Sequence, residues 1–325
     1  MFNLARTALW YALKDIVHTE KPSILVPEYV CDVVIHPLID LNFNIIYYTI
    51  DDLFEPIWNN LEELLKVHKV DYFLLVHFFG QPTSLLNTLT FCEKHHIKLI
   101  EDNAHGFRGQ LNNKLLGTFG FIGISSPRKN LEMSEGGVLY IMGEEFNGEI
   151  SLKQSSITIL QKFKKYLLNP QLFISIFRRR FFKINTDYSN PLYSFENVQG
   201  YYKLNSEKIN IIKNADWDLI LNNSRERWKT LLPILVTKYR LNPIWLKPFP
   251  DSNPWCLPMY CEDLEHRNAI LLHSEKNNLG FLSWPTLPKE IIFTKPLNLL
   301  RWNKLICIPL TNDKYVKNII NDTFK

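Results

Sequence analysis

The 325-residue sequence has no strong excess of one charge and no long apolar run. Its net charge of +4 is too small to indicate a nucleic-acid or anionic-membrane partner by itself. No stretch approaches the ~20 apolar residues that span a bilayer, and the first residues lack the basic region and apolar run of a signal peptide. These absences favour a soluble, cytoplasmic protein without a transmembrane segment and without a nucleic-acid partner.

The sequence also lacks a cysteine framework. Its five cysteines are odd in number and have no metal-ligand spacing, which fits a reducing cytosol and argues against a zinc site. Internal repeats and low-complexity tracts are absent as well. The length suffices for one large domain or two smaller ones.

The first half of the sequence alternates between helix-like and strand-like segments. Apolar spacing predicts helices at residues 7–16, 29–41, 58–68 and 83–95, and strands at 23–27, 44–50, 71–77, 97–101, 117–126 and 136–141. This order is typical of an α/β fold with a mainly parallel sheet flanked by helices. Ligands bind such sheets at the carboxyl ends of the strands, so the polar residues at 27–29, 77–80 and 101–105 are expected to meet in one crevice.

The composition changes after this alternating half. Residues 162–183 are aromatic and basic, and we interpret them as part of a helical insertion at residues 150–200 that packs on the core or on a partner. Contact with nucleic acid or an anionic membrane surface is the alternative, but no nucleic-acid-reading motif accompanies the segment.

The last third of the sequence predicts a second, smaller unit. A long helix is expected at residues 205–235, broken by Pro233, and another at 264–276. We therefore predict a large domain at residues 1–230 and a small C-terminal α+β domain at residues 231–325.

Lys129 is the candidate catalytic residue. It follows Arg128 on a short loop, and Gly136 and Gly137 come soon after it. A nearby cation and partial burial favour the free amine, which is the form that makes a Schiff base with an aldehyde. The alternative is an ordinary lysine on a surface loop.

Asp102 and His105 are candidate partners of an aromatic cofactor. Asp102 ends an apolar strand, and a carboxylate there can hold a protonated pyridine nitrogen. Glu101 is the rival acid, but strand alternation points the two side chains to opposite faces. His105 can donate to a phenolic oxygen or stack on the ring. The alternatives are a helix cap for Asp102 and a packing role for His105.

Arg6, Thr7, Ser125 and Ser126 are candidate phosphate ligands. Thr7 opens a predicted helix, where free backbone N–H groups attract an anion. Arg6 can add a bidentate contact. An ordinary threonine cap beside a solvated arginine is the alternative.

These segments, in this order, resemble the DegT/DnrJ/EryC1/StrS family of sugar aminotransferases. The resemblance covers most of residues 1–141 and rests on six motifs: Ala5-Arg6-Thr7-Ala8-Leu9, Val76-His77-Phe78-Phe79-Gly80, Glu101-Asp102-Asn103-Ala104-His105, Gly117-Thr118-Phe119-Gly120, Ser126 to Lys129-Asn130, and Glu135-Gly136-Gly137. The combined order is specific, whereas each motif alone is weak.

The resemblance implies the fold type I architecture of transferases that use pyridoxal 5'-phosphate, with the cofactor in the large domain. By resemblance, Lys129 binds the cofactor aldehyde and moves a proton, Asp102 binds the pyridine nitrogen, and His105 binds the ring hydroxyl. The implied substrates are a nucleotide-linked keto-sugar and an amino donor such as glutamate, for surface polysaccharide. The implied assembly is a homodimer with active sites between the subunits.

The sequence departs from the family pattern at several positions. Ile124 stands where a serine usually precedes the lysine by five residues, and Cys31 aligns with a ring-stacking aromatic residue that Tyr29 is a candidate to replace. The asparagine lent by the neighbouring subunit has no clear counterpart near residues 202–206. Two other functions stay open. One is a cofactor-dependent sugar dehydratase, against which Lys129 argues because such enzymes carry a histidine there. The other is a non-catalytic relative acting as a binding or assembly subunit.

Overall fold

The structure is a computed structural model that describes residues 1–142, 152 and 200–324. Of the predicted insertion at residues 150–200, only Leu152 and Gly200 are described, and the basic segment 162–183 lies outside the described residues.

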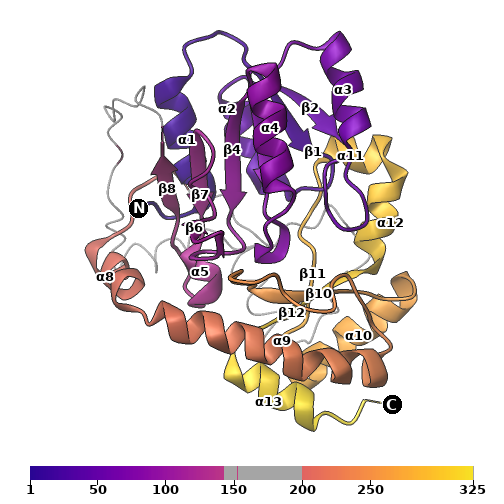
Figure 1. Ribbon diagram of the computed structural model, residues 1–325. Helices are drawn as coiled ribbons and strands as arrows, with labels where there is room; N and C mark the ends of the chain where they lie inside the picture. Colours follow the sequence, from indigo (N-terminus) through magenta and orange to yellow (C-terminus); the bar gives the residue numbers. More distant parts are fainter. Residues whose placement is uncertain (143–151, 153–199, 325) are drawn as a thin grey trace, which may run out of the picture.

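A six-stranded sheet forms the centre of the larger unit (Figure 1). Its strand order is β2-β1-β3-β4-β7-β8, and only β8 is antiparallel to its neighbour. The strands are β1 (Ser23–Pro27), β2 (Asn44–Tyr48), β3 (Tyr72–Val76), β4 (Lys98–Asn103), β7 (Ile122–Ser125) and β8 (Val138–Ile141). A short hairpin of β5 (Gln110–Leu111) and β6 (Lys114–Leu115) lies beside it. The wholly apolar β3 is buried along its length, as expected of a strand covered on both faces. The predicted mainly parallel α/β fold is confirmed.

Helices cover both faces of this sheet. α1 (Ala5–Ile16) packs on α2 (Asp32–Asp40) and on β7 and β8. α3 (Trp58–Val67) packs on β2, and α4 (Leu85–His95) on β3 and β4. Because parallel crossovers are right-handed, α2 lies on the face opposite to α3 and α4 (Figure 1). The first turn of α1 therefore reaches the carboxyl edge of the sheet on the α2 side.

The C-terminal part has its own sheet and core. Its four antiparallel strands run in the order β11-β12-β10-β9. They are β9 (Asn242–Pro243), β10 (Cys256–Tyr260), β11 (Leu282–Ser283) and β12 (Leu305–Pro309). The helices there are α9 (Trp217–Tyr239), α10 (Leu264–Asn277), α11 (Lys289–Thr294), α12 (Pro296–Lys304) and α13 (Asp313–Asn321). The predicted boundary at residue 230 falls inside α9, so the division into residues 1–230 and 231–325 stays a prediction.

The predicted helix at 205–235 was wrong in one respect. The structure has two helices there, α8 (Ser206–Asn214) and α9, and Pro233 lies inside α9. The break falls at Asp216 instead, whose carboxylate accepts a hydrogen bond from the N–H of Leu219 and caps α9. A helix-interior proline costs about 3 kcal/mol, and burial of Leu231 and Leu235 on either side of Pro233 offsets this cost.

No helix within residues 1–142 and 200–324 is both long and apolar enough to cross a membrane.

Candidate active site

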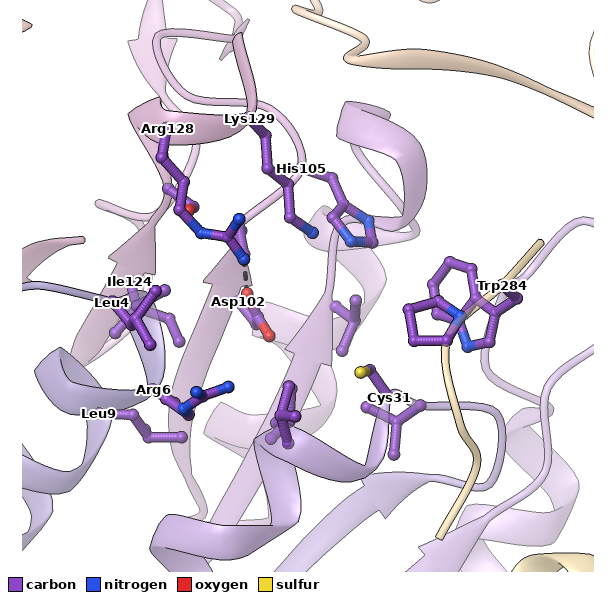
Figure 2. A pocket seen from close by; sticks show the side chains of 18 residues that line it. Leu4, Arg6, Leu9, Cys31, Asp102, His105, Ile124, Arg128, Lys129 and Trp284 are labelled. Carbon is purple, nitrogen blue, oxygen red and sulfur yellow. Dashed lines mark hydrogen bonds between the residues drawn. The ribbon is translucent and has the colours of Figure 1, made fainter. Parts of the chain in front are cut away.

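A cavity opens at the carboxyl edge of the six-stranded sheet (Figure 2). Val76, Asp102 and Ile124 are register partners on β3, β4 and β7, so their side chains point to the same face and line it. The first residues of α1 form another wall, and Trp284 of the smaller unit closes the far side. Of the three strand ends that were predicted to meet, 101–105 supplies Asp102, Ala104 and His105 to the wall, whereas no residue of 27–29 or 77–80 lines it.

Long basic side chains extend into this cavity. Arg6, Arg128 and Lys129 are directed into it, and the guanidinium of Arg128 points toward the carboxylate of Asp102 (Figure 2). The free volume is about 90 Å³, below the roughly 300–1,000 Å³ of small-molecule sites. The three cationic side chains in its wall favour a ligand that carries negative charge.

Asp102 is the acid that faces the cavity. Its side chain accepts a hydrogen bond of 2.9 Å from the N–H of Ala104. Burial raises the pKa of the Asp102 carboxyl, and the Ala104 N–H and the charge of Lys129 oppose that shift. The chain continues from Asn103 as turns, so Asp102 does not cap a helix.

Glu101 points to the opposite face, as alternation predicted. Its carboxylate accepts hydrogen bonds from the N–H groups of Gly117, Phe119 and Gly120 at 2.6 to 2.9 Å, and from His77 Nε2 at 3.0 Å. Burial acts to raise the pKa of Glu101, but these hydrogen bonds outweigh it and hold the pKa below its usual value. The Gly117 to Gly120 motif is therefore a set of backbone donors around Glu101, and the predicted strand at 117–126 is shorter than expected.

Lys129 lies on α5 (Pro127–Asn130), a single turn of helix. Its Nζ lies 5.3 Å from the centre of the Trp255 ring and close enough to Asp102 and His105 to influence both titrations. Ser126, which begins this turn, lines the cavity and donates through Oγ to the Gly136 carbonyl at 3.1 Å. The predicted lysine and acid thus lie in the wall of one cavity.

His105 is held as a neutral ring. Its Nδ1 accepts a hydrogen bond of 3.1 Å from the N–H of Phe79. Burial, together with the charges of Lys129 and Arg128, lowers the pKa of His105 well below its ordinary value. A neutral imidazole that accepts on Nδ1 carries its proton on Nε2, so His105 offers one N–H donor at the cavity.

The Glu-Gly-Gly motif fixes the start of α1. Gly137 exchanges backbone hydrogen bonds with Phe2, and the Gly136 N–H donates to the Asn3 carbonyl. A side chain on Gly137 would overlap the carbonyl group of Leu4. Close backbone contact therefore requires glycine there, and it places the positive end of α1 at the cavity.

Two of the predicted phosphate ligands do not line the cavity. Thr7 follows Arg6 on α1 but does not line the cavity. Its hydroxyl donates to Asn3 Oδ1 at 2.6 Å. Ser125 pairs with Asn103 on β4, one register position from Asp102, so it points to the opposite face. Arg6 and Ser126 do line the cavity.

The proposed replacement of the stacking aromatic residue also finds no support. Tyr29 is buried outside the cavity wall, 5.2 Å from the Trp284 ring, whereas Cys31 lines the cavity. The smaller unit contributes two aromatic residues that the sequence did not predict, Trp284 in the cavity wall and Trp255 beside Lys129. Both lie next to a proline in short loops, and no local pattern distinguishes them from other tryptophans.

Comparison with known proteins identifies relatives. The model of the DegT/DnrJ/EryC1/StrS aminotransferase family matches residues 7–167. A UDP-N-acetyl-3-dehydro-alpha-D-glucosamine 3-aminotransferase of Acidithiobacillus ferrooxidans is 24% identical over 139 residues, which are 42% of this chain. The matched part spans 38% of the length of that curated relative.

Solved structures share the fold over nearly the whole chain. Helicobacter pylori PseC, an aminotransferase involved in the biosynthesis of pseudoaminic acid, has a TM-score of 0.68 at 16% identity, covering 98% of this chain and 83% of its own. E. coli GDP-4-keto-6-deoxy-D-mannose-3-dehydratase with bound hydrated PLP has a TM-score of 0.62 at 13% identity, covering 98% of this chain and 85% of its own. The likeness confirms the predicted fold type I architecture.

Proposed function

The chain belongs to the DegT/DnrJ/EryC1/StrS aminotransferase family, and we propose that it is a pyridoxal-phosphate-dependent aminotransferase. In this proposal it transfers an amino group from a donor such as glutamate to a nucleotide-linked keto-sugar for surface polysaccharide. The observation that carries the proposal is the single cavity whose wall holds both Lys129 and Asp102.

The residues of the cavity fit this cofactor. Among the residues that the structure describes, its wall has three cationic side chains and one carboxylate, while His105 is neutral. Such a wall suits a phosphate anion at one end and a protonated ring nitrogen at the other. The remaining side chains are largely apolar, which suits an aromatic ring.

Each polar residue then has a role. Arg6, Ser126 and the first N–H groups of α1 would hold the phosphate. Asp102 would keep the ring nitrogen protonated, and His105 would donate to the phenolic oxygen. When bound, pyridoxal phosphate supplies an electrophilic aldehyde and a ring that withdraws electrons. Lys129 would supply the attaching amine and later accept and return the proton that moves between two carbons.

The relatives support the substrate class. The curated relative is named as a UDP-N-acetyl-3-dehydro-alpha-D-glucosamine 3-aminotransferase, and PseC is named as an aminotransferase involved in the biosynthesis of pseudoaminic acid. A homodimer with shared active sites is part of the proposal, because the family resemblance implies it. A cytoplasmic location is also part of it, and the five free thiols of the chain support that location.

The test is an absorbance scan of the purified protein, followed by borohydride reduction and peptide mapping. We expect bound cofactor, trapped on Lys129, and conversion of its spectrum to that of the amine form on addition of glutamate. Lys129→Ala should abolish trapping of the cofactor while the fold is retained. The substitution of an exposed lysine, Lys114→Ala, should leave trapping on Lys129 unchanged. Trapping without conversion by any amino donor would instead support the dehydratase. No trapping in the wild type would support a non-catalytic binding subunit.

A further inference from the structure

We propose that Trp255 of the smaller unit is a positioning residue for Lys129, whose amine it orients through the face of its indole ring. This inference rests on the proposed function, because it concerns the amine that attaches to the cofactor. It concerns a residue outside the motifs that carry the family resemblance.

The geometry is that of a cation–π contact. The Lys129 Nζ lies 5.3 Å from the Trp255 ring centre, within the ~6 Å over which a cation is attracted to an aromatic face. The same indole lies 5.7 Å from the ring of His105, so one side chain contacts two proposed cofactor ligands. The backbone fixes its place, since the Leu310 N–H donates to the Trp255 carbonyl at 3.0 Å and β10 begins at the next residue.

The indole face suits an amine that must gain and lose a proton. A carboxylate partner would hold the ammonium strongly and keep its proton. An aromatic face attracts the ammonium more weakly and accepts no conventional hydrogen bond, so it orients the amine without fixing the proton on it. The other charged or titratable groups that face Lys129 come from three elements: Asp102 on β4 and His105 after it, Arg128 on α5, and Cys256 on β10.

The contact also joins the two units of the chain. Lys129 lies on α5 of the larger unit, and Trp255 directly precedes β10 of the smaller one. The position of the Lys129 amine therefore depends on how the smaller unit packs against the larger one, and not only on α5.

The test measures cofactor loading and not turnover. Apoprotein is mixed with pyridoxal phosphate over a range of pH, and the attachment rate is followed by borohydride trapping and mapping of the Lys129 peptide. Trp255→Leu should move the pH midpoint of the rate about half a unit lower, a threefold change in proton affinity, because the ammonium loses its aromatic partner. The limiting rate at high pH should fall severalfold, because the amine is no longer oriented.

Two controls separate this role from a merely structural one. Trp245→Leu removes an indole whose ring centre lies 6.0 Å from that of Phe79. This variant should leave both the pH midpoint and the limiting rate of cofactor attachment unchanged. Trp255→Phe keeps an aromatic face and should restore most of the limiting rate. If Trp255→Leu does not fold, fluorinated tryptophan gives the same information without a change of size. Fluorination of the tryptophans should lower the pH midpoint of cofactor attachment in the wild type and not in Trp255→Phe.

An unchanged profile in folded Trp255→Leu, or an equal shift in Trp245→Leu, would overturn the inference. So would an equal response to fluorination in the wild type and in Trp255→Phe. Failure of the proposed function itself would look different, because the wild type would then trap no cofactor at any pH.

Discussion

The backbone N–H of Phe79 donates to Nδ1 of His105 at 3.1 Å, and this bond decides what His105 offers the cavity. A ring that accepts on Nδ1 must carry its proton on Nε2. The Val76 to Gly80 motif therefore sets the tautomer of a residue that lies 26 positions later in the chain than Phe79. A histidine that looks isolated in the sequence becomes a directed donor.

The neutral state of His105 predicts a pH dependence of stability. The pKa of His105 lies well below its ordinary value in the folded chain, chiefly because of burial. The unfolded chain takes up a proton near pH 6.5 that the folded chain does not bind. The free energy of unfolding should therefore fall as the pH drops below about 6.5, by at most about 1.4 kcal/mol per pH unit for this group. Urea unfolding of the apoprotein at pH 7 and pH 5.5 measures it.

The difference between variants isolates this contribution. His105→Gln should lose the part of the acid sensitivity that His105 causes, whereas the exposed His68→Gln should keep it. Equal pH dependence in His105→Gln and the wild type would show that the ring is not neutral in the folded chain.

Replacing Asp102 should separate folding from catalysis. Burial raises the pKa of the Asp102 carboxyl, so the folded apoprotein gains nothing from the charge. Asp102→Asn should leave the free energy of unfolding at pH 7 unchanged or higher. It should lower the rate of amino transfer roughly a hundredfold or more, because the ring nitrogen loses its anion.

Cofactor trapping distinguishes this effect from misfolding. Lys129 should still be labelled by borohydride in Asp102→Asn, and the exposed Asp218→Asn should behave as the wild type. Full activity in Asp102→Asn would remove Asp102 from the proposed site.

Glu101 should matter for stability although its neighbour matters for chemistry. Glu101→Gln removes the charge that gathers three backbone N–H groups and His77. Breaking such a buried arrangement costs about 3 kcal/mol or more. Urea unfolding at pH 7 should show this loss, while the exposed Glu63→Gln should change the free energy of unfolding by less than about 0.5 kcal/mol. Similar stabilities of the two variants would contradict the buried role of Glu101.

Gly137 should tolerate no side chain. Gly137→Ala would push a methyl group into the Leu4 carbonyl and displace the first turn of α1. Overpacking of this kind costs about 1–3 kcal/mol, and the displaced helix start should weaken cofactor phosphate binding in a fluorescence titration. Gly200→Ala is the matched control, because nothing lies within 4 Å of its added carbon. A cofactor affinity in Gly137→Ala equal to that of the control would show that this glycine does not set the phosphate end.

Patterns among neighbouring residues were enough to predict a large part of this fold. The apolar run that became β3 and the alternation that separates Glu101 from Asp102 each depend only on neighbouring residues. The break that the sequence predicted at Pro233 falls instead at Asp216, for a different reason. A proline opposes a helix locally, but burial of Leu231 and Leu235 in the smaller core is a tertiary effect.

By itself the sequence determined the α/β order of elements, the acid at the end of β4, and the lysine after β7, because periodicity, turn residues and motif order are properties of adjacent positions. Only the tertiary structure decided which hydroxyls face the cavity, which tautomer His105 adopts, and which tryptophan lies over the lysine. Those outcomes depend on elements far apart in the chain: Phe79 and His105 follow neighbouring strands of one sheet, whereas Lys129 and Trp255 meet where the two units pack together.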